Sequence, residues 1–150
     1  MRRLSLVATV LALAVVALPC SAQENFVEGT VSRIILLKVT PGMNSEFWAD
    51  IRSNIKPTYE EYKKQGIITD YSFFTKTSLE GPDDWSVGIR LTYKNFAGLD
   101  GLVAKMDPVT LKHYGGKDSR ASAAKKRALN GTTVKTYLIR EVDPKPMSNP

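Results

Sequence analysis

The run from Arg33 to Thr40 constrains the fold of this chain more than any other segment. It reads RIILLKVT, is rich in β-branched residues and stops at Pro41-Gly42, which is typical of a short strand. Because both of its faces are apolar, such a strand belongs in the middle of a sheet with cover on each side. The fold must therefore supply one layer above this strand and another below it.

A helix is predicted directly after this strand, over residues 45–65. Asn44 or Ser45 can cap its start and Gly66 can end it. Because Pro57 has no backbone donor, we expect the helix to bend or break near Asn54. Its apolar and aromatic side chains recur at steps of three and four residues: Phe47, Trp48, Ile51, Ile55, Tyr59 and Tyr62.

Two strands joined by a turn come next. Residues 67–77 predict the first strand and Gly81-Pro82-Asp83-Asp84 the turn. The return strand, residues 85–93, alternates between an apolar and a more polar face. The apolar face holds Trp85, Val87, Ile89, Leu91 and Tyr93, and the other holds Ser86, Gly88, Arg90 and Thr92.

The last third of the chain predicts two helical regions and a strand. The first helix starts after Asn95, with Leu99, Leu102, Val103 and Met106 as its apolar stripe, and Asp107-Pro108 is expected to break it. Residues 108–116 then form a helical turn, residues 119–129 a helix, residues 133–142 a strand, and residues 143–150 a disordered tail.

This order predicts an α+β, ferredoxin-like βαββαβ domain over residues 33–142, preceded by a leader at residues 23–32. Its antiparallel four-stranded sheet carries helices on one face only. The other face is too apolar for water, whether it presents Ile35, Leu37 and Val39 or their alternates Ile34 and Leu36 with Phe74 and Ile139. We therefore expect a second copy of the chain to cover it, as a homodimer.

The first 22 residues predict a secretory signal peptide. Arg2 and Arg3 precede an apolar stretch that is shorter than the roughly 20 residues a membrane span needs, so no transmembrane anchor is expected. Small residues ending at Ala22 predict cleavage there and a periplasmic or extracellular protein. A lipidated Cys20 is the alternative. Cys20 is the only cysteine, so cleavage after Ala22 leaves no disulfide and no thiolate metal site.

Positive charge is in mild excess, with 21 Lys and Arg against 15 Asp and Glu. Much of it lies between Lys117 and Arg127. That stretch is interpreted either as a solvated helical face or as a patch for anionic polymers or a membrane surface. No nucleic-acid motif is present, so no nucleic-acid partner is expected.

From Arg33 to Val142 the chain resembles the dimeric α/β barrel superfamily, which includes the antibiotic biosynthesis monooxygenase type. The resemblance rests on the strand Ile34 to Val39, the Pro41-Gly42 turn with its aromatic-containing helix, and the hairpin ending in Trp85. It implies two sheets closing face to face across a dimer, with a small-molecule pocket between each sheet and its own helices. Members include cofactor-free oxygenases and haem-dependent enzymes, so the fold alone does not select an activity.

Aromatic side chains are the candidate lining of such a pocket, although the same spacing is typical of an ordinary core. They are Trp48, Tyr59, Tyr71, Phe73, Trp85 and Tyr93. A catalytic role would fall to His113, Tyr71 or Trp85. His113 is the only histidine and the only candidate haem ligand or proton shuttle, and the alternative is an ordinary surface histidine.

No metal site is expected, because the single histidine removes most ligand sets. Arg90 lies on a strand between apolar neighbours, where it could hold an anion. We expect instead a charge pair across the dimer interface, for instance with Asp70 or Glu141.

These features favour an exported dimer that binds a small apolar ligand between sheet and helices. The alternative is a cofactor-independent or haem-dependent enzyme resembling the monooxygenases, and the sequence leaves open whether the protein is an enzyme. A third hypothesis is an envelope-associated protein that acts through the face from Lys117 to Arg127.

Overall fold

In the computed structural model, four antiparallel strands form one sheet in the order β2-β3-β1-β4. The structure describes residues 25–78, 81 and 84–146, so the predicted signal peptide lies outside the described residues. The strands are β1 (Phe26–Val39), β2 (Asp70–Thr75), β3 (Val87–Tyr93) and β4 (Gly131–Pro144). This arrangement confirms the predicted α+β, ferredoxin-like fold.

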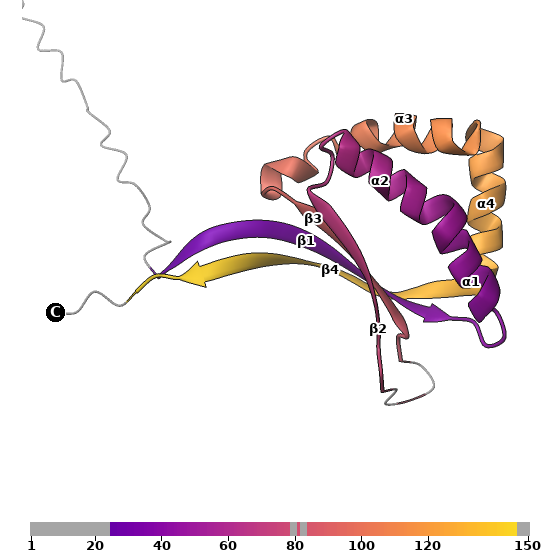
Figure 1. Ribbon diagram of the computed structural model, residues 1–150, viewed down its shortest axis with the longest axis horizontal. Helices are drawn as coiled ribbons and strands as arrows, with labels where there is room; N and C mark the ends of the chain where they lie inside the picture. The colour runs from indigo at the N-terminus through magenta and orange to yellow at the C-terminus, as the bar shows by residue number, and fades with distance from the viewer. Residues whose placement is uncertain (1–24, 79–80, 82–83, 147–150) are drawn as a thin grey trace, which may run out of the picture.

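The helices gather on one side of the sheet (Figure 1). They are α1 (Asn44–Asp50), the π-helical turn η1 (Ile51–Ile55), α2 (Lys56–Lys64), the 3₁₀ turn η2 (Phe96–Leu99), α3 (Leu102–Tyr114) and α4 (Lys117–Asn130). In Figure 1, α2, α3 and α4 lie along the three sides of a triangle. The order is therefore βαββααβ, because both helical regions predicted between β3 and β4 are present, whereas the predicted βαββαβ pattern counted them as one.

Alternation along β3 builds the core, as predicted. Val87, Ile89, Leu91 and Tyr93 are all buried and pack on the helix side, mainly against Phe47, Ile51, Tyr62 and Ile68. The sequence left open which residues of β1 face the helices. Ile35, Leu37 and Val39 pack toward this core, whereas Ile34 and Leu36 face away from the helices beside Arg90 and Gly88. We call the surface on that far side of the sheet the open face.

The first predicted helix is interrupted where Pro57 requires it. Pro57 lies in the first turn of α2, a position that tolerates a missing backbone donor, and the π-helical turn η1 precedes it. The Thr58 hydroxyl donates to the carbonyl of Asn54 over 2.8 Å, which satisfies a backbone acceptor at the junction. The chain therefore continues in one direction through α1, η1 and α2.

The prediction that Asp107-Pro108 ends a helix is wrong. Pro108 lies inside α3, which continues to Tyr114 and ends at Gly115 in the left-handed conformation. Pro108 and Ala104, whose carbonyl loses its donor, are both exposed, so water can replace the missing hydrogen bond. Val103 is also exposed and does not belong to the apolar stripe.

The first and last strands are longer than predicted. β1 begins at Phe26, so most of the predicted leader belongs to the sheet, and β4 runs through Pro144, into the predicted tail. β1 pairs with β3 only from Val31 onward, and its first residues pair with the end of β4 alone. Figure 1 shows this two-stranded ribbon projecting away from the helices. Among the described residues, no helix has the length and apolar character of a membrane span.

One contact on the open face predicts a destabilising substitution. A Cβ atom on Gly88 would lie 2.1 Å from the ring of Phe74, far inside contact distance. We expect Gly88→Ala to lower the free energy of unfolding by about 1 to 3 kcal/mol, because the ring must move off the strand. Urea unfolding of the variant measures the loss. Gly81→Ala is the control, because a Cβ there meets nothing within 4 Å. Equal stability of the two variants would contradict the Phe74 packing.

Candidate ligand pocket

A cavity of about 310 Å³ lies between α2, α3 and α4. No strand contributes to it; its walls come from the three helices and from the end of η1. The lining residues combine aromatic, apolar and cationic side chains: Ile55, Thr58, Tyr59, Tyr62, Thr110, Tyr114, Arg120, Ala124 and Arg127. The predicted pocket lies between sheet and helices, whereas this cavity is bordered by helices alone.

Arg127 joins the three parts of the helical layer next to this cavity. Its Nε donates to Oδ2 of Asp50 over 2.6 Å, and its Nη2 to Oδ1 of the same carboxylate over 3.3 Å. Nη2 also donates to the hydroxyl oxygen of Tyr114 over 2.7 Å. One guanidinium on α4 is therefore tied both to α1 and to α3.

Arg120 occupies the same side of α4, two turns earlier. Its Nη1 donates to Oδ1 of Asp107 on α3 over 3.0 Å, and both side chains are about two-fifths exposed. Residues seven apart lie on one face of a helix, so Arg120 and Arg127 both border the cavity. Within residues 117–127, these two arginines are thus partly exposed but also form ion pairs with other helices, which neither interpretation of the basic stretch included.

The tyrosines from α2 form the opposite wall. Tyr62 is buried, and its hydroxyl shares a hydrogen bond of 2.5 Å with Thr110, which in turn donates to the carbonyl of Met106. Burial, with a smaller effect of the neighbouring Tyr62, raises the pKa of Tyr59 well above its usual range. The Tyr59 hydroxyl therefore stays protonated and can donate a hydrogen bond at any physiological pH.

Tyr93 of β3 places another hydroxyl on the sheet side of Tyr59 and Tyr62. The residue is fully buried, and within the described part of the chain its hydroxyl has no hydrogen-bond partner. Burial raises the pKa of Tyr93 as well. A buried tyrosine hydroxyl usually finds a partner, so this position has the polarity to hold a water molecule.

Of the six side chains predicted to line a pocket, only Tyr59 lines this cavity, and Tyr71 borders a separate polar hollow next to Arg90 and Glu141. Tyr71 and Phe73 contact the Tyr59 ring from β2, with centroid separations of 5.6 and 6.2 Å. They form the aromatic support behind it, where they belong to the core together with Tyr93. Trp48 packs edge-on against Phe47, also in the core.

Trp85 does not join this set. Its ring lies edge-on to Phe74, which covers Gly88 on the open face. The sequence placed Trp85 on the helix side by extending the alternation of β3, but the strand starts at Val87 and the alternation does not reach Trp85.

The three catalytic candidates lie apart. His113 is at the end of α3, Tyr71 is on β2 and Trp85 lies next to the open face, so no pair of them faces a shared cavity. Tyr71 donates to the carboxylate of Glu60, and burial together with this bond raises the pKa of Tyr71 to about 12. It is therefore a poor general base near neutral pH.

The surroundings of His113 do not fit a haem. The residue is exposed, its Nε2 lies 3.3 Å from Oδ1 of Asn54, and its ring packs edge-on against Tyr114. The hollow that it borders is lined largely by polar and charged side chains, including Glu61, Lys64 and Lys112, whereas a haem requires an apolar slot. In the part of the chain that the structure covers, no three His, Cys, Asp or Glu side chains are grouped to hold a metal ion.

Arg90 forms the ion pair expected with Glu141, but within one chain. Its guanidinium bonds the Glu141 carboxylate across the open face, and its Nε donates to the hydroxyl of Ser32 over 2.9 Å. Asp70, the other expected partner, pairs with Lys63.

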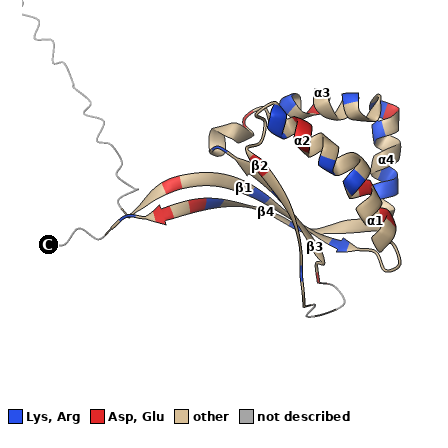
Figure 2. Cartoon of the chain, in the orientation of Figure 1, with Lys and Arg blue, Asp and Glu red and all other residues tan. Residues whose placement is uncertain are grey.

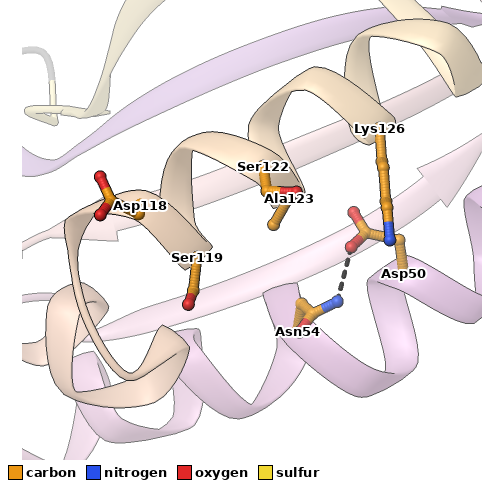
Figure 3. A pocket seen from close by; sticks show the side chains of 7 residues that line it. All are labelled: Asp50, Asn54, Asp118, Ser119, Ser122, Ala123 and Lys126. Atoms are coloured by element: carbon orange, nitrogen blue, oxygen red, sulfur yellow. Dashed lines mark hydrogen bonds between the residues drawn. The ribbon is translucent and has the colours of Figure 1, made fainter.

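A second, larger hollow of about 520 Å³ lies on the other side of the contact between α4 and α1. Figure 3 shows its lining: Asp50, Asn54, Asp118, Ser119, Ser122, Ala123 and Lys126. These side chains are mostly small or polar and none is aromatic. We regard the aromatic cavity, although smaller, as the better ligand site, because its tyrosine rings and arginines offer a planar ligand both packing surfaces and fixed hydrogen-bond donors.

The sequence analysis missed Tyr62, Tyr114, Arg120 and Arg127 as lining residues. Two features of the sequence could have indicated the arginines and Tyr114. The arginines are spaced seven residues apart within the basic stretch, and Tyr114 directly follows the only histidine. Neither signal says which remote residue is the partner, because Asp50 and Arg127 are 77 residues apart in the sequence.

No protein-family model matches the chain, and no curated protein is similar in sequence. Among solved structures, it is similar to a dimeric protein of unknown function and ferredoxin-like fold from Bacteroides fragilis, with 15% identity, a TM-score of 0.41, and coverage of 75% of this chain and 95% of that one. It is also similar to a hypothetical Arabidopsis thaliana protein solved in solution, with 14% identity, a TM-score of 0.44, and coverage of 86% and 99%. Function is therefore inferred from the residues of this chain.

The tyrosine pKa values predict a loss of stability at alkaline pH. Tyr59, Tyr62, Tyr71 and Tyr93 all have raised pKa values in the folded state, so folding favours their protonated form. Their contribution is complete below about pH 10, the pKa of an unfolded tyrosine, and is lost as the pH rises through the folded values.

Urea unfolding between pH 8 and pH 12 should show a free energy of unfolding that is level up to about pH 10 and then falls. Tyr59→Phe should fall less steeply, because the unfolded chain then has one phenol fewer to ionise. A free energy that stays level to pH 12, or that falls equally in both proteins, would contradict the burial of these hydroxyls.

Proposed function

We propose that this protein is an exported, dimeric binding protein that holds a small, largely apolar ligand between α2, α3 and α4. The observation that carries the proposal is the cavity of about 310 Å³ with two tyrosines on one wall and a third tyrosine opposite them. Ligand sites in proteins are concave and mainly apolar, with a few fixed polar groups. This cavity has both properties.

The size of the cavity limits the ligand. Small-molecule sites usually start at about 300 Å³, so this one suits a ligand of one or two rings. Tyr59 and Tyr62 present aromatic faces on which a planar ring can pack. A ligand-binding role is better supported than catalysis, because the candidate residues His113, Tyr71 and Trp85 do not meet.

Binding of a neutral aromatic probe tests this function. Naphthalene-2-carboxamide should bind the mature protein with a stoichiometry of one per chain in a calorimetric titration. Ala124→Phe should lower its affinity about tenfold or more, because the new ring occupies the cavity that Ala124 lines.

Ala121→Phe is the matched control, since Ala121 is an exposed residue of the same helix that lines none of the five hollows described in the structure. It should bind the probe like the unmodified protein. A failure of the probe to bind, or equal losses in the two variants, would refute the pocket as the ligand site.

The dimer is supported by the open face. On β4, Tyr137 and Ile139 pair with Ile34 and Ser32 of β1, so their side chains lie on this face, and both are more than a third exposed. Seven paired residues at about 3.4 Å and four strands at about 4.8 Å give a face of roughly 450 Å² per copy. Two such faces approach the lower range for a specific interface, about 1,000 Å² in total.

A charge on the open face should therefore separate the two copies. We expect light scattering at micromolar concentration to give twice the mass of one chain for the unmodified protein and one chain for Ile139→Asp, because a carboxylate buried there has no partner. Leu138→Asp is the control, since Leu138 is similarly exposed on the opposite face of β4. A monomeric unmodified protein, or dimers of Ile139→Asp, would exclude this interface.

A further inference from the structure

We propose that the ligand of the helical cavity carries a carboxylate, which Arg120 and the hydroxyl of Tyr114 bind. This inference rests on the proposed ligand-binding function and narrows it to aromatic acids of one or two rings. It accounts for the two arginines in a cavity whose other lining residues are uncharged.

Arg120 has unused hydrogen-bond donors. A guanidinium carries five N–H groups, and in the described part of the chain only one of them, on Nη1, is used, by Asp107 at 3.0 Å. The remaining N–H groups belong to a side chain that lines the cavity. Arg120 can therefore make the paired hydrogen bonds by which arginine recognises a carboxylate.

Arg127 has a different role, because three of its five N–H groups are already used within the helical layer. It gives two hydrogen bonds to Asp50 and one to the oxygen of Tyr114. Since the Tyr114 oxygen accepts that bond, its own O–H proton points away from Arg127. Tyr114 lines the cavity, so this proton is available to a ligand acceptor. Arg127 is thus a positioning residue that turns the Tyr114 hydroxyl into a donor.

The two donors come from α3 and α4, and both line the cavity. Figure 2 shows Lys and Arg positions spread along the helices, with Asp and Glu positions between them. Within the basic stretch, Lys117 and Lys125 are exposed and line none of the described hollows, so the positive charge at this cavity comes from the two arginines. Asp107 and Asp50 hold them in place but also offset their charge.

The test compares two probes of equal shape, 2-naphthoate and naphthalene-2-carboxamide, by calorimetry on the mature protein. We expect the acid to bind more tightly than the amide. Arg120→Gln should lower the affinity for 2-naphthoate about tenfold or more and leave that for the amide within about twofold. Lys125→Gln, which removes one positive charge from the same helix, should change neither.

A second variant should raise the affinity for 2-naphthoate instead of lowering it. Asp107→Asn keeps Arg120 and removes the negative charge that competes with the ligand, so the affinity for 2-naphthoate should rise about twofold to tenfold. A merely structural role for Arg120 predicts no gain. This variant also decides the matter if Arg120→Gln does not fold.

The outcomes separate this inference from the proposed function. Equal binding of acid and amide, with no effect of Arg120→Gln or Asp107→Asn, would overturn the carboxylate and leave the apolar pocket standing. Failure of both probes to bind would overturn both. Loss of 2-naphthoate alone in Arg120→Gln, with a gain in Asp107→Asn, would establish the carboxylate site.

Discussion

The ion pair between Arg127 and Asp50 determines where the last helix lies. α4 buries little apolar surface, because its apolar residues are alanines and the exposed Leu129, and Asn130 is its only buried residue. It is attached to the other helices by polar contacts, with Arg127 reaching α1 and α3 and Arg120 reaching α3. Partly exposed ion pairs contribute about 0 to 1 kcal/mol each. The wall of the cavity formed by α4 is therefore held more weakly than the others, and it is the wall that can yield when a ligand enters.

The opposite wall is held by the core. Tyr62 and Ile51 are buried against the alternating residues of β3, and Tyr59 stacks on Phe73 of β2. The Tyr59 ring thus belongs to the core on one side and to the cavity on the other. Such a site combines a rigid aromatic support with an adjustable polar wall, so it can fix the plane of a ligand while adapting to its length.

Much of the fold could be predicted from local patterns. β3 was predicted well because strict alternation of apolar and polar side chains is typical only of a strand with one buried face. The interruption of the first helix near Asn54 was predicted from the missing backbone donor of Pro57. The same reasoning failed at Pro108, because a proline on the exposed side of a helix leaves its unpaired carbonyl to water. Trp85 was misplaced because alternation holds only within a strand, and pairing with the neighbouring strands sets where the strand begins.

The site was harder to predict than the fold. The spacing of apolar residues shows which side of a helix is buried. It does not indicate polar pairs between helices that lie far apart in the sequence. Arg120 and Arg127 look like part of a solvated basic stretch until Asp107 and Asp50 are placed beside them. Only Tyr59 among the expected lining residues could be recognised, because it continues the aromatic stripe of its own helix.

The projecting ribbon of β1 and β4 brings the two ends of the described chain together. The backbone N–H of Lys145 donates to the carbonyl of Asn25 over 2.9 Å, and Figure 1 shows this meeting point far from the helical triangle. Because Lys145 meets Asn25, the described part of the chain is nearly a closed loop in space. Residues 25 and 145 could be joined by a short linker and new ends cut elsewhere without disturbing the order of the strands. Any tether to a surface or a fused domain, at either end, would hold the molecule by the ribbon and leave the cavity at the far end facing outward.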